Sequence, residues 1–271
     1  MHTQNGISFM RMLIIGVVIV IEVMLTSRAN ADESPKPLSA KEILHRSDNI
    51  RNPSMPFATQ ITITEYNKAK EVDKMVIKVH SKQQKNSGQY RSLVEFLQPS
   101  RDSGKLMLKN GNEIWFYDPA ASNSIRLSPQ QRLMGQASNG DVMTANFALD
   151  YNVEIHAEEV IKDANKNPRI TYRLHMTAMN ENVTYAVADF WVEKQTNRPV
   201  KAKFYSSSNR LMKIAYYRRF QKKLGEFRPT EVLIIDAVDT NKVTRLLMDD
   251  FHAVNIPEAW FQRGYLPRFK G

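Results

Sequence analysis

Beyond residue 56 the chain alternates apolar and polar residues with the two-residue period of half-buried strands. Ile61 and Ile63 share one face of the first such segment, with threonines on the other, and Met75 and Ile77 share one face of the next. Candidate strands stand at 57–66, 74–80, 90–97, 105–109, 113–117 and 123–127, then at 153–162, 169–176, 183–194, 199–205, 211–222, 228–237 and 244–251.

The connections between these segments indicate hairpins. Asn110-Gly111 stands between two of them, and Asn-Gly is typical of a tight β-turn. The segments follow one another too closely for parallel crossovers, which favours antiparallel pairing. A large twisted sheet does not stay flat, so the pattern predicts a curled antiparallel sheet of about 10–11 strands, an incomplete β-barrel with one concave face.

The strand pattern is preceded by a helix. Ser39 and Glu42 have the residue types and spacing of a capping box, which predicts a helix over 40–49. Pro53 and Pro56 are expected to end it, because proline cannot donate a backbone hydrogen bond.

A second interruption lies in the middle of the chain. Ser128 and Pro129 resemble a helix cap and first turn, which predicts a helix ending near Met134. Residues 135–140 interrupt this helix, and the pattern of residues 141–149 predicts a second short helix. We expect this helical insertion to cover the concave face, which makes the fold class α+β.

The first 31 residues predict a secretory signal peptide. Arg11 precedes an apolar run over 12–25 that only Glu22 interrupts, and Ala29-Asn30-Ala31 has the small-residue pattern of a cleavage site. The run is shorter than the ~20 residues that a membrane span needs. We predict cleavage after Ala31, a periplasmic location and a single domain over 32–271. A signal retained as an N-terminal anchor is the alternative.

Charge and cysteine content narrow the partners. The chain carries a formal net charge of +10 and no cysteine, so no disulfide supports the fold. In an exported protein, such a charge favours anionic lipid head groups or lipopolysaccharide over nucleic acid. A solvated basic surface without a specific partner is the other interpretation.

Catalytic and metal-binding motifs are not recognised. The mature histidines are scattered singly, whereas zinc needs three or four converging ligands. Asp163, Asn165 and Asn167 mimic half of a calcium loop, but Pro168 stands where glycine is required. We expect neither an enzyme nor a metal or cofactor. An envelope enzyme acting on lipid, with Asp141 or His156 taking part, is a further hypothesis.

Methionine supplies the more informative pattern. The chain has 13 methionines, and this side chain suits irregular apolar binding surfaces as well as ordinary cores. Met134, Met143 and Phe147 lie on the two short predicted helices beside a glycine-containing break. This placement is typical of a movable cover over a cavity.

An ordered set of short motifs resembles a known family. It comprises Phe96-Leu97-Gln98-Pro99, Gly104–Leu108, Trp115–Pro119, Arg126–Pro129, Gln131–Gly135, Asn146–Tyr151 and the closing Trp260–Leu266. Together these resemble the outer-membrane lipoprotein-sorting proteins, the LolA-like periplasmic family often found beside RND or MMPL-type exporters. The resemblance implies an incomplete antiparallel barrel that wraps helices and receives acyl chains in an apolar interior.

The resemblance predicts a periplasmic carrier of lipid or lipidated cargo. It implies an inner-membrane RND/MMPL-type transporter as donor and an outer-membrane acceptor. The expected cavity residues are Ile61, Ile63, Met75, Ile77, Trp115, Tyr117, Leu133, Met134, Met143 and Phe147. If the other strand face points inward, Ile114 and Phe116 replace Trp115 and Tyr117. Arg126 and Arg132 are expected at a lipid head group or on the cover, or else as ordinary surface charges.

A second hypothesis belongs to another functional class. The same barrel would serve as a periplasmic sensor or adaptor of an envelope transporter or stress pathway, recognising a protein partner or stray lipid.

Overall fold

Successive strands fold back on one another and build one antiparallel sheet. The computed structural model describes residues 37–270, and 13 strands form this sheet, more than the 10–11 expected because every candidate segment is a strand. They are β1 (Phe57–Asn67), β2 (Lys70–Gln83), β3 (Tyr90–Gln98), β4 (Leu106–Asn110), β5 (Glu113–Asp118), β6 (Asn123–Leu127), β9 (Tyr151–Lys162), β10 (Pro168–Ala178), β11 (Val187–Glu193), β12 (Pro199–Tyr205), β13 (Leu211–Lys223), β14 (Glu226–Asp236) and β15 (Lys242–Ala253).

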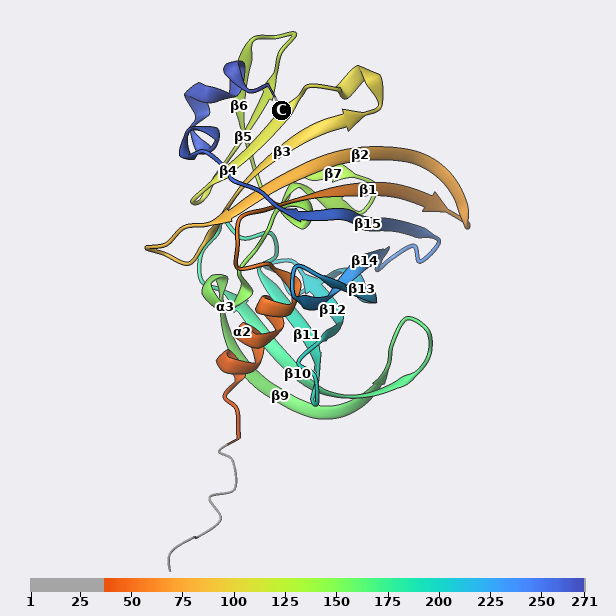
Figure 1. The fold of residues 1–271 in the computed structure, drawn as a ribbon. Coiled ribbons are helices and arrows are strands. Elements are labelled where there is room, and N and C mark those ends of the chain that lie inside the picture. The colour runs from red at the N-terminus through yellow and green to blue at the C-terminus, as the bar shows by residue number, and fades with distance from the viewer. Residues whose placement is uncertain (1–36, 271) are drawn as a thin grey trace, which may run out of the picture. The chain divides into compact units, whose positions relative to one another are not determined.

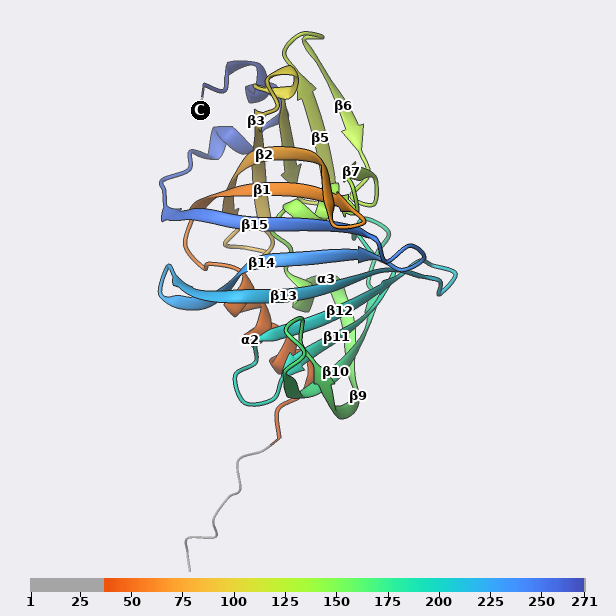
Figure 2. The ribbon, with the colours of Figure 1, turned by 90° about the vertical axis from the view of Figure 1, so that its right-hand side faces the viewer.

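The first and last strands of the sheet are neighbours at its centre. The spatial order is β6-β5-β4-β3-β2-β1-β15-β14-β13-β12-β11-β10-β9, so β6 and β9 are the two edges (Figure 1). Ile61 of β1 lies opposite Met248 of β15, and Ile63 lies opposite Leu246. The sheet curls strongly but does not close, as Figure 2 shows from the side. The predicted curled antiparallel sheet is confirmed.

Helix α2 (Ala40–Arg51) begins as predicted. The Ser39 hydroxyl accepts a hydrogen bond from the Glu42 backbone N–H at 3.3 Å, and the Glu42 carboxylate accepts one from the Ser39 N–H at 2.8 Å. Ile43 and Leu44 are completely buried. They belong to the helix that packs inside the curve of the sheet, against β9, β11 and β14.

The prediction of two helices in the insertion, residues 128–150, was wrong. Its first part is a two-stranded hairpin, β7 (Arg132–Met134) with β8 (Ala137–Ser138). Its second part is a 3-10 turn, η2 (Asn139–Val142), and a single helical turn, α3 (Phe147–Asp150). Packing on the sheet overrides the local cap, because the Gln136 N–H donates to Thr244 Oγ1 of β15 at 2.7 Å. The insertion links edge strand β6 to edge strand β9.

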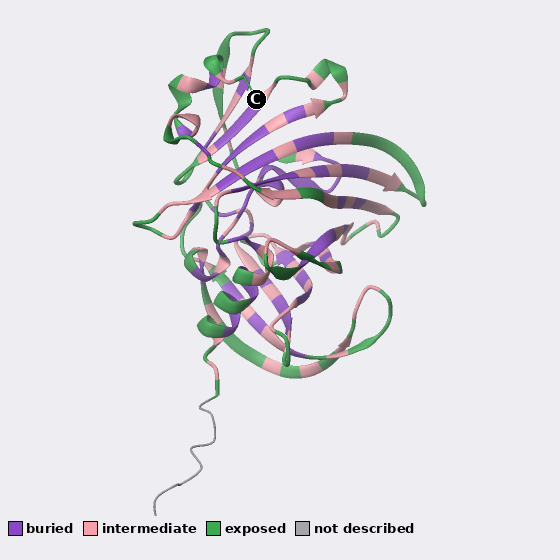
Figure 3. Cartoon of the chain, in the orientation of Figure 1, coloured by how far each residue is buried: buried purple, intermediate pink, exposed green. Residues whose placement is uncertain are grey.

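The remaining 3-10 turns are η1 (Ser100–Asp102), η3 (Glu258–Phe261) and η4 (Arg263–Arg268). Buried residues follow the middle of the inner strands, whereas the hairpin tips and the edge strands β6 and β9 are largely exposed or half-buried (Figure 3). Among the described residues, no helix is both long and apolar enough to span a membrane. The predicted signal peptide, its cleavage after Ala31 and the start of the domain at residue 32 lie outside the described residues and stay predictions.

Candidate functional site

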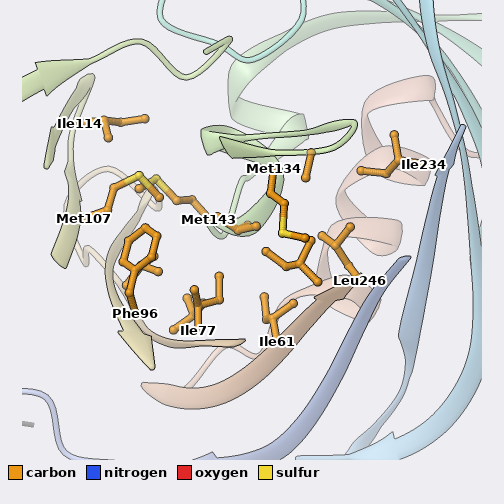
Figure 4. Close-up of a cluster of buried hydrophobic side chains, with 14 residues drawn as sticks. Ile61, Ile77, Phe96, Met107, Ile114, Met134, Met143, Ile234 and Leu246 are labelled. Carbon is orange, nitrogen blue, oxygen red and sulfur yellow. The ribbon is translucent and has the colours of Figure 1, made fainter. Parts of the chain in front are cut away.

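Side chains of the sheet and of the insertion meet on the concave face (Figure 4). We call this group the concave cluster. Its buried members are Ile61, Ile63, Ile77, Val79, Val94, Phe96, Met107, Ile114, Met134, Ala137, Val142, Met143, Ile234 and Leu246. Met75 and Leu133, also expected at the cavity, are partly buried and pack against it. The structure therefore brings together most of the residues that the sequence pattern selected.

Trp115 and Tyr117 are corrections, because they point to the convex face. In the β4–β5 pair, Lys109 lies opposite Ile114 and Met107 lies opposite Phe116. Since side chains alternate along a strand, Ile114 and Phe116 face the concave side and their neighbours face away from it. The sequence left this choice open, and the register decides it.

The convex face has its own apolar group, which we call the convex cluster. Its buried members are Leu93, Leu106, Leu108, Tyr117, Ile256, Phe261 and Leu266, with Trp115, Val254, Trp260 and Phe269 partly buried around them. The C-terminal segment after β15 supplies much of it. That segment is anchored by Asn110 Nδ2, which donates to the Phe261 carbonyl at 2.9 Å, and by Glu258, which pairs with Lys82 and Arg91.

An apolar cavity of about 140 Å³ lies under the insertion. One wall consists of residues 140–145 and Phe147, and Ile61 and Val79 contribute from β1 and β2. Ile61, Met143 and Phe147 are the expected residues that line it directly. No sequence pattern marked the lining residues from the second half of the sheet, which are Phe204, Ala215, Tyr217, Pro229, Val232, Ile234, Leu246, Met248 and Phe251.

The end of α2 holds the insertion from one side. Asn52 Nδ2 donates to the Ala145 carbonyl at 2.8 Å, and the Asp48 carboxylate accepts from the Ala148 N–H at 2.8 Å. Arg51 pairs with Asp48 and places its guanidinium 3.8 Å from the centre of the Phe147 ring. Burial raises the pKa of Asp48, and the Arg51 charge opposes that shift. These contacts fix the insertion at the rim of the cavity.

A buried polar group holds the insertion from the other side. Lys213 Nζ of β13 donates to Ser138 Oγ at 2.7 Å and lies 3.5 Å from the Asp141 carboxylate. The Tyr185 hydroxyl donates to the same carboxylate at 2.7 Å. Burial lowers the pKa of Lys213 and raises that of Tyr185 well above its usual value. Lys213 and Tyr185 are therefore structural partners of Asp141 and hold the insertion in place.

Two glycines let the insertion approach closely. A Cβ on Gly140 would lie 1.9 Å from Thr184 Oγ1, and one on Gly135 would lie 2.4 Å from Thr244 Oγ1. Gly135 also has a φ of +52°, which side chains disfavour. Glycine is therefore required where the insertion touches its surroundings.

The remaining expected residues do not line the cavity. Arg126 lies opposite Trp115, on the convex side, with 57% of its side chain exposed and Glu113 3.9 Å away. Arg132 is exposed at the start of β7, where its charge adds to the burial that lowers the Lys213 pKa. His156 is exposed on β9, with its ring 6.3 Å from that of His175. Among the described residues, no three His, Asp or Glu side chains are grouped so as to hold a metal ion.

Comparisons with known proteins agree with this architecture. A protein-family model described only as "uncharacterized protein" matches residues 88–268, and no curated protein matches the chain. A DUF1329 family protein from Desulfovibrio piger has the same fold, with 22% identity and a TM-score of 0.70 over 84% of this chain and 97% of that one. A structure described as an outer membrane lipoprotein-sorting protein domain, from Vibrio parahaemolyticus, gives 20% identity and a TM-score of 0.69 over 84% and 98%.

A more similar structure carries the family assignment. It is a LolA superfamily protein from Nitrosomonas europaea, with 34% identity and a TM-score of 0.76. The alignment covers 84% of this chain and 100% of that one. At this identity over the whole length of the relative, and with the same fold, the chain belongs to the LolA superfamily.

Proposed function

We propose that this protein binds lipid or lipidated cargo in the cavity under the insertion and carries it across the periplasm. The observation behind the proposal is an apolar cavity on the concave face, beneath an insertion that polar contacts and apolar packing hold in place. The donor would be an inner-membrane RND/MMPL-type transporter and the acceptor an outer-membrane component. Membership in the LolA superfamily supports a binding role rather than catalysis.

The energetics explain why a cavity is needed. Each methylene transferred from water gains ~0.8 kcal/mol on burial, so a chain of about 16 carbons resists leaving a membrane by roughly 10 kcal/mol or more. A carrier lowers this cost only by offering an apolar surface of similar extent. The concave cluster and the cavity supply that surface.

The cavity is too small for a long chain in the conformation described. Its 140 Å³ is close to the ~150 Å³ of engineered cavities that bind benzene, whereas pockets for larger ligands span roughly 300–1,000 Å³. Loading therefore requires the insertion to move outward. The contacts of Asn52 and Lys213 with the insertion are the ones that would exchange for water on opening.

Ala215→Leu tests the cavity directly. Ala215 is 2% exposed and faces the cavity from β13, so the larger side chain would occupy space that the cargo needs. We expect at least a tenfold weaker affinity for a fluorescent long-chain fatty acid, with a change in unfolding free energy below about 3 kcal/mol.

Ala253→Leu is the matched control, since Ala253 is exposed at the end of β15. It should leave binding unchanged. Absence of saturable binding by the unaltered protein would remove the carrier proposal and would favour the sensor or adaptor hypothesis, for which capture of a membrane regulator is the corresponding assay.

A further inference from the structure

A second, smaller pocket of about 60 Å³ adjoins the apolar cavity. Gly140, Ala145, Phe147 and Thr184 line both spaces, so a single layer of residues separates them. The other walls of the small pocket are largely polar and include Gln89, Lys109, Asn112, Asp150, Asn180 and Asn182. By the usual allowance of about 10–15 Å³ per water it has room for roughly four waters, which is the scale of a phosphate or carboxylate group.

Lys109 is the cation that faces this pocket. It stands near the end of β4, opposite Ser92 and Ile114, and both of these residues point to the concave interior. Among the described residues, no carboxylate lies within 4.0 Å of its ammonium and no hydrogen bond reaches it. Burial lowers the pKa of Lys109, and Asp150 opposes that shift. A partly buried ammonium without an acceptor is costly, and an anionic ligand group would offset that cost.

The opposite side of the pocket lacks a donor. Gln89 Nε2 donates to the Asp150 carboxylate at 2.7 Å, while Gln89 Oε1 is buried and has no hydrogen-bond partner among the described residues. Burial raises the pKa of Asp150, and Lys109 opposes the shift. A purely anionic ligand would be repelled by this carboxylate. A ligand that also carries an N–H or O–H donor would satisfy both Gln89 and Asp150.

We propose that the small pocket is a head-group subsite for an amphiphile whose chain enters the apolar cavity when the insertion moves outward. The head group combines a phosphate or carboxylate, held by Lys109, with a hydrogen-bond donor directed to Asp150 and Gln89. This inference rests on the proposed function and specifies its cargo as an amphiphile whose head group carries both an anionic group and a hydrogen-bond donor. It assigns to Lys109 the contact with the lipid head group that was expected for Arg126 and Arg132.

The test compares three probes with the same acyl chain and different head groups. These are a monoacylglycerol, a lysophosphatidic acid and a lysophosphatidylethanolamine, measured by displacement of the fluorescent fatty acid. Lys109→Met should weaken the binding of both phosphate lipids at least tenfold, the usual size of a hydrogen bond to a charged group, and leave the affinity for the monoacylglycerol unchanged. Lys109→Arg should restore most of the loss.

A second variant examines the donor side. Asp150→Asn keeps an acceptor for Gln89 but removes the negative charge, so it should strengthen lysophosphatidic acid and abolish any preference for the ethanolamine lipid. Lys78→Met is the matched control for Lys109→Met, because Lys78 lies on the convex face of the same sheet, opposite Glu95. It should change none of the three affinities.

The outcomes separate this inference from the proposed function. If the unaltered protein binds none of the amphiphiles, both fail together. If the monoacylglycerol binds and Lys109→Met weakens all three probes equally, or none of them, the head-group assignment alone is overturned. Inorganic phosphate is measured as well. If it binds as tightly as the phosphate lipids and depends on Lys109, the pocket takes a free anion and the head-group assignment is again overturned.

Discussion

The two faces of one sheet are covered in different ways. On the convex face, the C-terminal segment buries Ile256, Phe261 and Leu266 to 1% exposure. On the concave face, the insertion combines apolar burial of Met134 and Met143 with polar contacts such as Asn52 to Ala145, and it leaves a cavity beneath it. Side chains that border unfilled space have fewer packing partners to lose than side chains in a filled core. The C-terminal segment is therefore suited to a permanent seal, and the insertion above the cavity is suited to a cover that opens.

The largest expected effect comes from breaking the convex seal. Phe261→Ala removes a buried ring from the convex cluster and should lower the unfolding free energy by about 3–5 kcal/mol, measured by urea denaturation. Binding of the fluorescent fatty acid by the folded variant should stay within twofold of the unaltered protein. A tenfold weaker affinity at a temperature where the variant is folded would contradict the separation of the two faces.

A pH series sharpens the comparison, because the convex face buries a neutral histidine. His80 is 4% exposed, packs edge-on against Trp260 with ring centres 5.2 Å apart, and has no hydrogen-bond partner for either ring nitrogen among the described residues. Burial lowers its pKa to about 4, helped by the nearby charges of Lys78 and His252.

The sign follows from proton binding. As the pH falls through 6.5 the unfolded chain takes up this proton and the folded one does not, so stability is lost between about pH 6.5 and 4, by up to roughly 3 kcal/mol. His80→Leu should reduce the loss between pH 7.5 and pH 5 by about 2 kcal/mol in denaturation experiments. His45→Gln, at an exposed position on α2, is the control. An unchanged pH slope in His80→Leu would count against the buried neutral imidazole.

The smallest expected effect tests a residue that the structure places outside both clusters. Arg126→Ala removes a largely exposed side chain and should change the unfolding free energy by less than about 0.5 kcal/mol. It should also leave the affinity for anionic amphiphiles unchanged, in contrast to Lys109→Met. If Arg126→Ala selectively lost affinity for anionic amphiphiles, the head group would instead be bound by Arg126 on the convex side.

Sequence periodicity was a good guide wherever a strand had one buried face. The alternation around Ile61 and Ile77 predicted both the strands and the residues that now pack in the concave cluster. It failed in the insertion, where Ser128 and Pro129 indicated a helix and the chain forms a hairpin. A short segment has few local contacts, so docking of Gln136 on Thr244 outweighed its capping preference.

Strand β5 shows why the sequence did not predict which of its two faces points to the cavity. It is apolar on each side, with Ile114 and Phe116 facing the insertion and Trp115 and Tyr117 facing the C-terminal segment. Alternation carries no information when both faces are buried. Lys109 was passed over for a related reason, since a lysine ending a strand is typical of a solvated hairpin and nothing local marks it as facing a pocket.

The sequence by itself determined the strands, the capped first helix and an antiparallel sheet large enough to curl, because these depend on residue period and turn chemistry within short windows. Only the tertiary structure decided that β1 pairs with β15. That pairing joins residues nearly two hundred positions apart, and it brings Ala215, Ile234 and Leu246 to the same cavity as Ile61. No local pattern encodes such a contact, since its free energy comes from burying both partners only after the whole sheet has formed.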